Sequence, residues 1–308
     1  MRPFVQLPFR ELPDAPRVPH GYLGLEPRDV IVNSEPFGSV RIRYRVLGEG
    51  PPLLLLHGLM TSGYSFRYVV EPLAKSFTCY IPDLVGSGES DKPDRPYSAP
   101  AYSIFLLELI DALGIRGTDV VANSMAGYLA MQAAIVDPRA MKRLVNIHSP
   151  GVPLKRLHAL RFAMSIPIAE PILKRIVRLD IDRWIHRNVH YYDETLKSRE
   201  ECRIYGAPLR ESAGLHAFAR ILGETLDPVD MQRFVETLED MKKRGEPFPI
   251  PLYLLYADDD PMVPPVVGER LRALLPSATF KEIKQTSHFM HVDTPQKFLD
   301  AALPFLGN

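Results

Sequence analysis

Short apolar runs separated by turn-forming residues predict the strands of this chain. Residues 40–46 alternate apolar and basic side chains, which is typical of a strand with one solvated face. Four consecutive leucines at 53–56 instead predict a strand that is buried on both faces. Similar runs predict further strands at 30–32, 78–81, 120–122, 144–147, 251–256 and 279–283.

Apolar residues at helical spacing lie between most of these strands. They predict helices at 61–76, 101–113, 128–136, 264–275 and 295–306. Strand and helix therefore alternate with short connections, which favours a mostly parallel sheet with helices on both faces. Ligands in such sheets bind at the carboxyl ends of the strands, so polar residues that follow a strand are candidates for function.

The alternation breaks between residues 150 and 247, where no strand is predicted. Helical stretches are expected there at 155–178, 181–190, 193–204, 209–223 and 229–244. A helical insertion between strands whose ends form a site is expected to cover that site as a lid. The expected domains are a first part of an α/β core at 1–149, which opens with a proline-rich strap at 1–28, a helical cap domain at 150–247 and a second part of the core at 248–308.

Charge and composition restrict the classes of function. The 308 residues carry a formal net charge of zero, so there is no global electrostatic case for binding nucleic acid or an anionic membrane. The two cysteines, Cys79 and Cys202, form no metal-binding or disulfide pattern. No apolar run is long enough to span a membrane and the N-terminus lacks the apolar segment of a signal peptide, so we expect a cytoplasmic location.

One turn is a candidate for chemistry. The apolar residues 120–122 lead through Asn123 into Ser124, and an alanine-rich helical segment follows at once. A serine between a strand and a helix can be an exposed nucleophile beside a helix N-terminus, or an ordinary N-cap residue. These residues alone do not decide between the two interpretations.

A nucleophilic serine needs a neighbouring base and a group that orients that base. Among the nine histidines, His57 and His148 follow predicted strands, and His288 and His291 share the loop after the last strand. Asp258–Asp260 follow another strand. Because three adjacent acids are costly to bury together, we expect two of them to be solvated and one to turn inward.

Four motifs, taken in order, resemble those of the α/β-hydrolase superfamily. They are His57–Gly58, the segment Asp83–Ser90, the turn Ala122–Gly127 and the loop Ser287–Phe289. The resemblance extends from about residue 38 to the end of the chain. It implies a mostly parallel eight-stranded sheet with helices on both faces and an inserted helical cap.

The resemblance also implies a Ser-His-Asp triad. Ser124 is expected to be the nucleophile and His288 the base. The family pattern G-x-x-D-x-x-V-P maps onto residues 257–264 and selects Asp260 as the acid that orients the base. No cofactor and no metal site are expected.

The resemblance places the oxyanion hole at two backbone N–H groups, those of Leu59 and Met125. His57 resembles the structural histidine of the family's oxyanion loop, which positions the backbone and does not titrate. The turn carries Ala122 and Ala126 where glycine is commoner, and we expect Gly127 to allow the helix to pack closely there.

Differences from individual branches of the superfamily narrow the reaction. Residues 57–64 and 83–93 look very like those of haloalkane dehalogenases and epoxide hydrolases, but those enzymes use an aspartate at the position of Ser124. We therefore do not expect halide or epoxide chemistry. Asn123–Met125 also resembles the carbon–carbon hydrolases of ring-fission products, which usually carry a tryptophan where this chain has Phe289.

We expect a serine hydrolase that cleaves a carboxylic ester or a related acyl compound, such as a lactone, through an acyl-enzyme intermediate. Two alternatives remain: a carbon–carbon hydrolase of the ring-fission-product type, and a non-catalytic ligand receptor on the same fold. The expected partner is a small molecule with an apolar portion, and no nucleic acid. The sequence leaves the oligomeric state open.

The first helical stretch of the insertion is both basic and apolar. Its charge could recruit an anionic substrate or a membrane surface, or form a solvated outer face, and we favour the solvated face. The apolar residues between the charges are expected to pack beneath the lid or to line the pocket. They are Leu157, Leu160, Phe162, Met164, Ile168, Ile172 and Ile176, with Trp184 and Phe218 further along.

Overall fold

The computed structural model describes residues 3–307, and its centre is an eight-stranded sheet. The strand order is β1-β2-β4-β3-β5-β6-β7-β8. β1 and β2 pair antiparallel, as do β2 and β4, and all other neighbours are parallel. The expected fold class is thereby confirmed. The strands are β1 Pro27–Ser34, β2 Gly38–Leu47, β3 Pro52–Leu56, β4 Thr78–Pro82, β5 Thr118–Asn123, β6 Met141–Ile147, β7 Leu252–Ala257 and β8 Thr279–Ile283.

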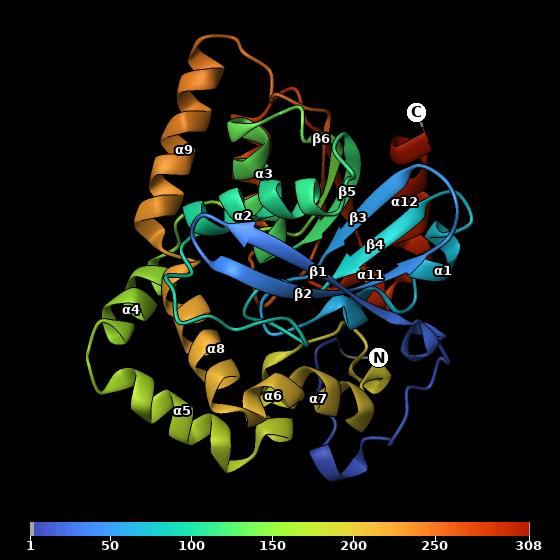
Figure 1. Cartoon of the computed structure of the whole chain (residues 1–308), viewed down its shortest axis with the longest axis vertical. Coiled ribbons are helices and arrows are strands. Elements are labelled where there is room, and N and C mark those ends of the chain that lie inside the picture. The colour runs from blue at the N-terminus through green and yellow to red at the C-terminus, as the bar shows by residue number, and fades with distance from the viewer. Residues whose placement is uncertain (1–2, 308) are drawn as a thin grey trace.

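Helices cover both faces of this sheet (Figure 1). The leucines of β3 show why two layers are needed. Leu54 and Leu56 contribute to one hydrophobic cluster, with α2 (Ala99–Ala112), α3 (Met125–Val136) and α10 (Val266–Leu274). Leu53 and Leu55 contribute to the other, with α1 (Val70–Leu73), α11 (Met290–Asp293) and α12 (Pro295–Gly307). All four leucines are at most 1% exposed, as predicted for a strand buried on both faces.

The helix expected at 61–76 is largely absent. The structure instead has a 3₁₀ turn, η3 (Gly63–Phe66), followed by the short helix α1. The backbone N–H of Gly63 donates to the Asp83 carboxylate at 2.8 Å, and Ser62 accepts from the N–H of Tyr64. These side-chain acceptors take up backbone donors and hold the segment as a turn, in competition with a regular helix.

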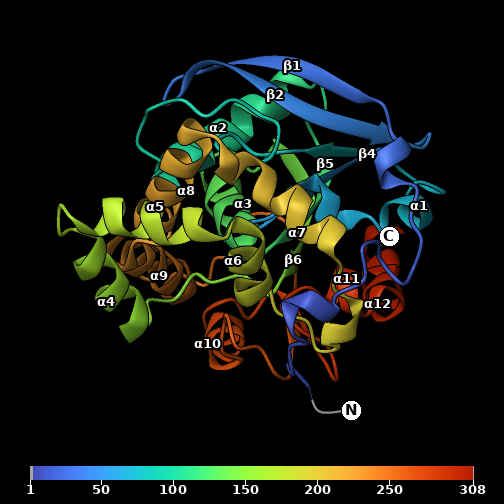
Figure 2. The ribbon, with the colours of Figure 1, turned by 90° about the horizontal axis from the view of Figure 1, so that it is seen from below.

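Between β6 and β7 the described chain is helical. This helical insertion comprises α4 (Lys155–Met164), α5 (Ala169–Leu179), α6 (Ile181–Asn188), α7 (Arg199–Gly206), α8 (Ser212–Glu224) and α9 (Pro228–Lys243). The single helix expected at 155–178 is two helices, because Pro167 cannot donate a backbone hydrogen bond and disfavours helical geometry in the residue before it. Figure 2 shows α4 and α5 at the outer edge of the molecule.

The proline-rich N-terminal segment lies along the helical insertion. The N–H of Phe4 donates to the Tyr192 carbonyl at 3.2 Å, and the N–H of Arg199 donates to the Pro13 carbonyl at 2.8 Å. These bonds tie the segment to the α6–α7 part of the insertion.

A buried ion pair joins the insertion to the sheet-bearing part of the chain. Arg67 follows η3, and its Nη2 lies 2.5 Å from Glu201 Oε2 on α7, with each side chain about 1% exposed. The Tyr191 hydroxyl donates to the same carboxylate at 2.8 Å. Because neither charge can reach water, each depends on the other.

Replacing one member of this pair is expected to be costly. Glu201→Gln leaves the Arg67 charge buried without a counter-charge, so the free energy of unfolding should fall by about 3–5 kcal/mol. Urea unfolding followed by circular dichroism measures this change. Glu282→Gln, at an exposed position on β8, is the matched control and should change little. Equal stabilities for the two variants would contradict the role of the pair.

Candidate active site

Ser124 lies at the apex of the turn between β5 and α3. Its backbone has φ 55° and ψ −124°, a positive φ that is rare for any residue except glycine. Its side chain is partly exposed, whereas Asn123 and Met125 on either side are buried. The turn therefore presents the hydroxyl to open space at the carboxyl end of β5. Gly127 allows α3 to pack closely, as expected, because the Cβ of any other residue there would lie 2.3 Å from Asn146 Oδ1.

Asp260 and His288 are adjacent, although 28 residues separate them in sequence. Asp260 follows β7 and His288 follows β8, and Asp260 Oδ2 lies 2.6 Å from His288 Nδ1. Asp258 and Asp259 are exposed, while Asp260 is 4% exposed. The pattern of two solvated acids and one inward acid is thus the one expected from the cost of burying three charges.

The Asp260 carboxylate has four hydrogen-bond partners. Oδ1 accepts from the N–H groups of Met262 at 2.6 Å and Val263 at 3.0 Å, and Oδ2 faces His288 at 2.6 Å and His148 at 2.9 Å. Burial alone would raise the pKa of Asp260. Electrostatic attraction and hydrogen bonds from the ring N–H groups of His288 and His148 outweigh burial and hold this pKa well below its ordinary value.

His148 also contacts Asp260, and no role was predicted for it from the sequence. It follows β6, is fully buried and has a positive φ of 49°. Its position directly after a strand was the available signal, but nothing in the sequence showed that its ring would reach Asp260. The distance between them depends on how β6 and β7 pair.

Asn123 connects the serine turn to the histidine loop. Its Nδ2 donates to the backbone carbonyl of His288 at 2.9 Å and to that of Ile147 at 3.3 Å. Within residues 3–307, the Ser124 hydroxyl and the His288 ring share no hydrogen bond. Such bonds are often long in unliganded enzymes and tighten in the substrate complex.

The backbone N–H groups of Leu59 and Met125 donate to no acceptor in the described part of the chain. The loop that carries Leu59 approaches the serine closely, since a Cβ at Gly58 would lie 3.0 Å from Ser124 Cβ. Met60, the next residue along, has a positive φ of 63°. Both N–H groups are therefore available to an oxygen atom bound beside Ser124.

His57 and Asp83 hold the loops around this site. His57 Nε2 accepts from the N–H of Leu84 at 2.9 Å, so Nδ1 carries the proton and donates to the Gly58 carbonyl at 2.8 Å. Burial lowers the pKa of His57, which favours this neutral form. Asp83 accepts from the N–H groups of Gly63 and Glu89, each at 2.8 Å.

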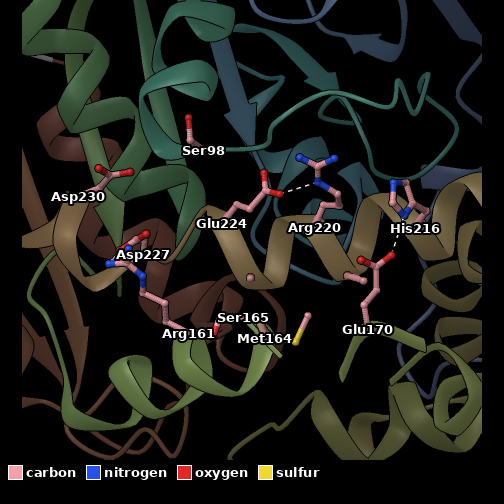
Figure 3. A pocket seen from close by; sticks show the side chains of 12 residues that line it. Ser98, Arg161, Met164, Ser165, Glu170, His216, Arg220, Glu224, Asp227 and Asp230 are labelled. Atoms are coloured by element: carbon pink, nitrogen blue, oxygen red, sulfur yellow. Dashed lines mark hydrogen bonds and ion pairs between the residues drawn. The ribbon is translucent and has the colours of Figure 1, made fainter. Parts of the chain in front are cut away.

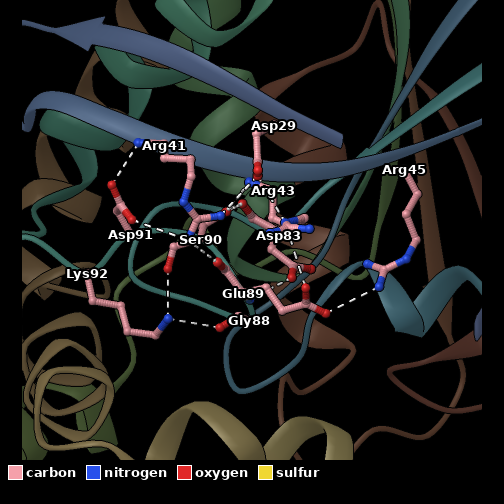
Figure 4. A network of polar contacts seen from close by, with 10 residues as sticks. All are labelled: Asp29, Arg41, Arg43, Arg45, Asp83, Gly88, Glu89, Ser90, Asp91 and Lys92. Carbon is pink, nitrogen blue, oxygen red and sulfur yellow. Dashed lines mark hydrogen bonds and ion pairs between the residues drawn. The ribbon is translucent and has the colours of Figure 1, made fainter. Parts of the chain in front are cut away.

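The loop after β4 is also bound to the face of β2 (Figure 4). Arg41 and Arg43 share Asp29 as a partner at 3.0 Å, and Arg45 reaches Glu89 at 3.2 Å. The basic positions that alternate along β2 are therefore a partly solvated ion-pair network, which keeps the 83–92 loop in place.

A small hollow of about 20 Å³ opens beside Leu59. It lies between the loop 59–61, the loop 86–88 and residues of the helical insertion, including Tyr205, Phe218 and Ile221. Its lining contains no charged side chain. Phe218 was expected in such a position, and the hollow lies next to one of the two unbonded N–H groups.

A larger hollow of about 500 Å³ lies between α4 and α8 (Figure 3), and its lining does not include Ser124. Most of its charged residues are paired with one another: Arg220 contacts Glu224, His216 contacts Glu170 and Arg161 contacts Asp227. Asp230 pairs with Arg233, which lies outside the lining. These contacts satisfy the charges locally.

His148, Asp260 and His288 have ligand atoms within 4.8 Å of one another, and are the group of three in residues 3–307 that could hold a metal ion. No metal site was expected from the sequence. The ring nitrogens that face Asp260 already take part in hydrogen bonds with it.

The helices of residues 3–307 include none with the length and apolarity needed to cross a membrane.

A family model described as the alpha/beta hydrolase family matches residues 53–301. The chain therefore belongs to the α/β-hydrolase family. This match includes Ser124, Asp260 and His288, and it extends through the helical insertion.

Individual relatives differ in their chemistry. An uncharacterised protein of Mycobacterium tuberculosis is 27% identical over 296 residues, which cover 91% of this chain and 83% of that protein. The 2-hydroxymuconate semialdehyde hydrolase of Pseudomonas sp. is 25% identical over 275 residues, covering 87% and 91% of the two chains. The solved epoxide hydrolase CorEH has a TM-score of 0.74 and 20% identity, with 92% and 98% covered. Similarity therefore shows the family, and the particular reaction has to be argued from the site.

Because the pKa of Asp260 is low, we expect the free energy of unfolding to depend on pH. A carboxyl whose folded-state pKa lies below its unfolded value of about 4 stabilises the fold above that pH, and this contribution is lost as the pH falls further. Asp260→Asn should therefore lower the free energy of unfolding at pH 7, and the difference from the unmodified protein should shrink below about pH 4. Urea unfolding at several pH values measures the difference.

Asp259→Asn, at the exposed neighbouring position, is the control for this series and should unfold like the unmodified protein at pH 7. A loss of stability in Asp260→Asn that stays constant down to acid pH would contradict the electrostatic account.

Proposed function

We propose that the protein is a serine hydrolase that cleaves a carboxylic ester or a related acyl substrate through Ser124, His288 and Asp260. The observation that carries the proposal is the 2.6 Å contact between Asp260 and the ring of His288, next to a serine on a strained, partly exposed turn. A strained serine alone could be a structural feature. A buried acid–imidazole pair tied to the same turn through Asn123 is the arrangement that activates a hydroxyl nucleophile.

In the proposed reaction, the Ser124 hydroxyl attacks the acyl carbonyl while His288 Nε2 accepts its proton. Asp260 holds the proton on Nδ1, so Nε2 is free to act as the base. The same ring then returns the proton to the leaving alcohol, which departs and leaves an acyl-serine ester. Water, deprotonated by His288, cleaves that ester and restores the serine.

The carbonyl oxygen becomes negative during each attack, and hydrogen-bond donors that point at this oxygen stabilise it. The N–H groups of Leu59 and Met125 lie on the two segments that flank Ser124 and are without acceptors in residues 3–307. Loss of one such donor typically raises a reaction barrier by about 3–4 kcal/mol. Because both donors belong to the main chain, substitution of either side chain leaves them in place.

The hollow beside Leu59 supports a substrate with an apolar portion, since its lining includes Phe218 and Ile221 and no charged side chain. The helical insertion supplies these residues, and we propose that it acts as the cap over the site, within the domain limits 150–247. A cytoplasmic location is part of the same proposal.

A carbon–carbon hydrolase is the second candidate, and the similarity to the 2-hydroxymuconate semialdehyde hydrolase favours it. That substrate carries a carboxylate, which would need a cationic or strong donor group in the pocket. Among the described residues, those around the hollow beside Leu59 include no such cation, and the ester reaction requires none, so it is the reaction that we favour. A non-catalytic receptor would have no need for the Asp260–His288 contact.

Removal of the nucleophile should separate these possibilities. Ser124→Ala is expected to lower kcat for p-nitrophenyl esters by about 10⁴-fold or more, and to abolish labelling by a fluorophosphonate at the serine, because no other group can form the acyl-enzyme. Leu59→Ala keeps the backbone donor and should stay within about tenfold of the unmodified protein. Initial rates and mass spectrometry of the labelled peptide measure both effects.

Three results would count against this proposal. The absence of both ester turnover and Ser124 labelling would favour the receptor, and turnover of 2-hydroxymuconate semialdehyde in preference to every ester would favour the carbon–carbon hydrolase. Loss of turnover on treatment with EDTA would indicate that His148, Asp260 and His288 act as metal ligands.

A further inference from the structure

Several apolar residues of α4 and α5 face solvent, which overturns the expectation that they pack beneath a lid, whereas Leu157 is buried as expected. Ile168 is 63% exposed and Phe162 is 71% exposed. Ile172, Ile176 and Leu179 continue the exposed row along α5 at 48%, 48% and 77%. Residues 155–179, which form α4, α5 and their connection, are called the α4–α5 arm below.

The exposed row follows helical geometry. Ile168, Ile172, Ile176 and Leu179 are spaced four, four and three residues apart, so they form one stripe along one face of α5. The inward side of the same helix has its own apolar contacts, through Leu173 and the fully buried Val177. The outer stripe is therefore additional to what the helix needs for packing on the insertion, and such clustered exposure marks an interaction surface.

The α4–α5 arm is also strongly basic. It contains six lysines and arginines and one acid, a formal charge of +5 in a chain whose net charge is zero. Arg161 lies beside Asp227, with which it pairs (Figure 3), and Lys174 pairs with Glu170. Within residues 3–307, the other four basic side chains have no acidic partner, and all four are exposed: Lys155, Arg156, Arg175 and Arg178.

A surface hollow of about 490 Å³ lies beside the apolar stripe. Lys174, Arg175 and Arg178 line it together with Pro171 and Leu179. Three cationic side chains next to exposed leucine and isoleucine are complementary to an anionic group that is attached to a hydrocarbon chain.

We propose that the α4–α5 arm docks on an anionic phospholipid surface, with the stripe on α5 inserted among the lipid chains and the basic residues among the headgroups. A helix with an apolar stripe flanked by lysine and arginine is the form that lies in a membrane interface. Each basic residue near such a surface adds attraction to the negative headgroups. α5 packs against α8, which carries Phe218 of the hollow beside Leu59, so docking places the lipid surface one helix away from the proposed site.

A second copy of this chain is the competing occupant. In a symmetric dimer the same patch meets itself, so the basic residues of one copy would face those of the other. Repulsion between two such surfaces opposes that contact, whereas negative headgroups neutralise the charge. Charge therefore favours the lipid surface.

Vesicle sedimentation tests the proposal. The full chain is expected to bind vesicles of phosphatidylcholine mixed with phosphatidylserine, to bind vesicles of phosphatidylcholine alone far less, and to dissociate as the salt concentration rises. The variants Ile172→Ser/Ile176→Ser and Arg175→Gln/Arg178→Gln should each weaken binding by about tenfold or more, because each removes one of the two contributions. Ester turnover in solution should stay unchanged in both.

Matched substitutions elsewhere serve as controls. Ile31→Ser and Arg270→Gln change an isoleucine that is 56% exposed and an exposed arginine outside the arm, and should bind vesicles as the unmodified protein does. Equal binding to both vesicle types, or full binding by the arm variants, would overturn the proposal. So would a dimer, seen by light scattering and broken by Ile172→Ser/Ile176→Ser, in a protein that does not bind vesicles.

A separate observation concerns His148. The N–H of Ala257 donates to His148 Nδ1 at 2.8 Å, so Nδ1 is the acceptor and Nε2 carries the proton. That proton points to the Val263 carbonyl at 2.8 Å and to Asp260 Oδ2 at 2.9 Å. The ring is therefore a donor to the same oxygen that binds His288.

From this geometry we infer that His148 is a positioning residue for the proposed reaction, and the inference rests on the proposed function. His148 fixes the plane of the Asp260 carboxylate, and the carboxylate fixes the ring of His288. The positive φ of His148 supports a specific role, because such backbone strain persists where the surroundings require one orientation. Groups that orient a functional ligand in this way typically change its effect by about 10–100-fold when removed.

His148→Ala is expected to lower kcat for an ester by about 10–100-fold with little change in KM, since the ring touches the acid and not the substrate. His148→Gln, whose amide can still donate to Asp260, should recover most of that loss. An unchanged kcat in His148→Ala would overturn the inference, and so would a glutamine variant no more active than the alanine variant. Full ester turnover in Ser124→Ala would instead show that the proposed function itself is wrong.

Discussion

The buried carboxylate of Asp260 is the constraint on which the site depends. A charge that is 4% exposed persists only if its oxygens are bound by donors, and here the donors come from three places in the chain: its own loop, the loop after β6 and the loop after β8. Satisfying this one group therefore brings together the carboxyl ends of three strands. The parallel pairing of β6, β7 and β8 makes this possible, because it directs those ends to one edge of the sheet.

The remaining parts of the site depend on strained backbone conformations and on backbone hydrogen bonds. Met60, Ser124 and His148 have positive φ, and each directly or closely follows the carboxyl end of a strand. Strain of this kind is stable only in a rigid surrounding, and the two-sided burial of β3 and β5 supplies it. Since the hydrogen-bond donors proposed for the oxyanion belong to the main chain, the fold itself, and not a set of side chains, defines that part of the site.

The helical insertion has two surfaces with different chemistry. Its inner surface contributes Phe218 and Ile221 to an uncharged hollow, and the Arg67–Glu201 pair holds α7 against the rest of the molecule. Its outer surface at the α4–α5 arm carries exposed isoleucines and arginines. The zero net charge of the whole chain hides this local concentration, because acids elsewhere balance it.

The sequence by itself determined the fold class and most of the strands, because strands buried on both faces, such as β3 and β7, form short continuous apolar runs between turn-forming residues. It also singled out Ser124, Asp260 and His288 by motif and order, and the structure brings the last two into contact. Tertiary structure decided the rest. The contact of His148 depends on the pairing of β6 with β7, the turn at 63–66 depends on an acceptor 20 residues away, and the outward direction of Ile172 and Ile176 depends on which face of α5 packs inward. Periodicity shows that a helix has an apolar stripe, but a helix with two such stripes can bury only one of them, and which one is chosen is a property of the packed molecule.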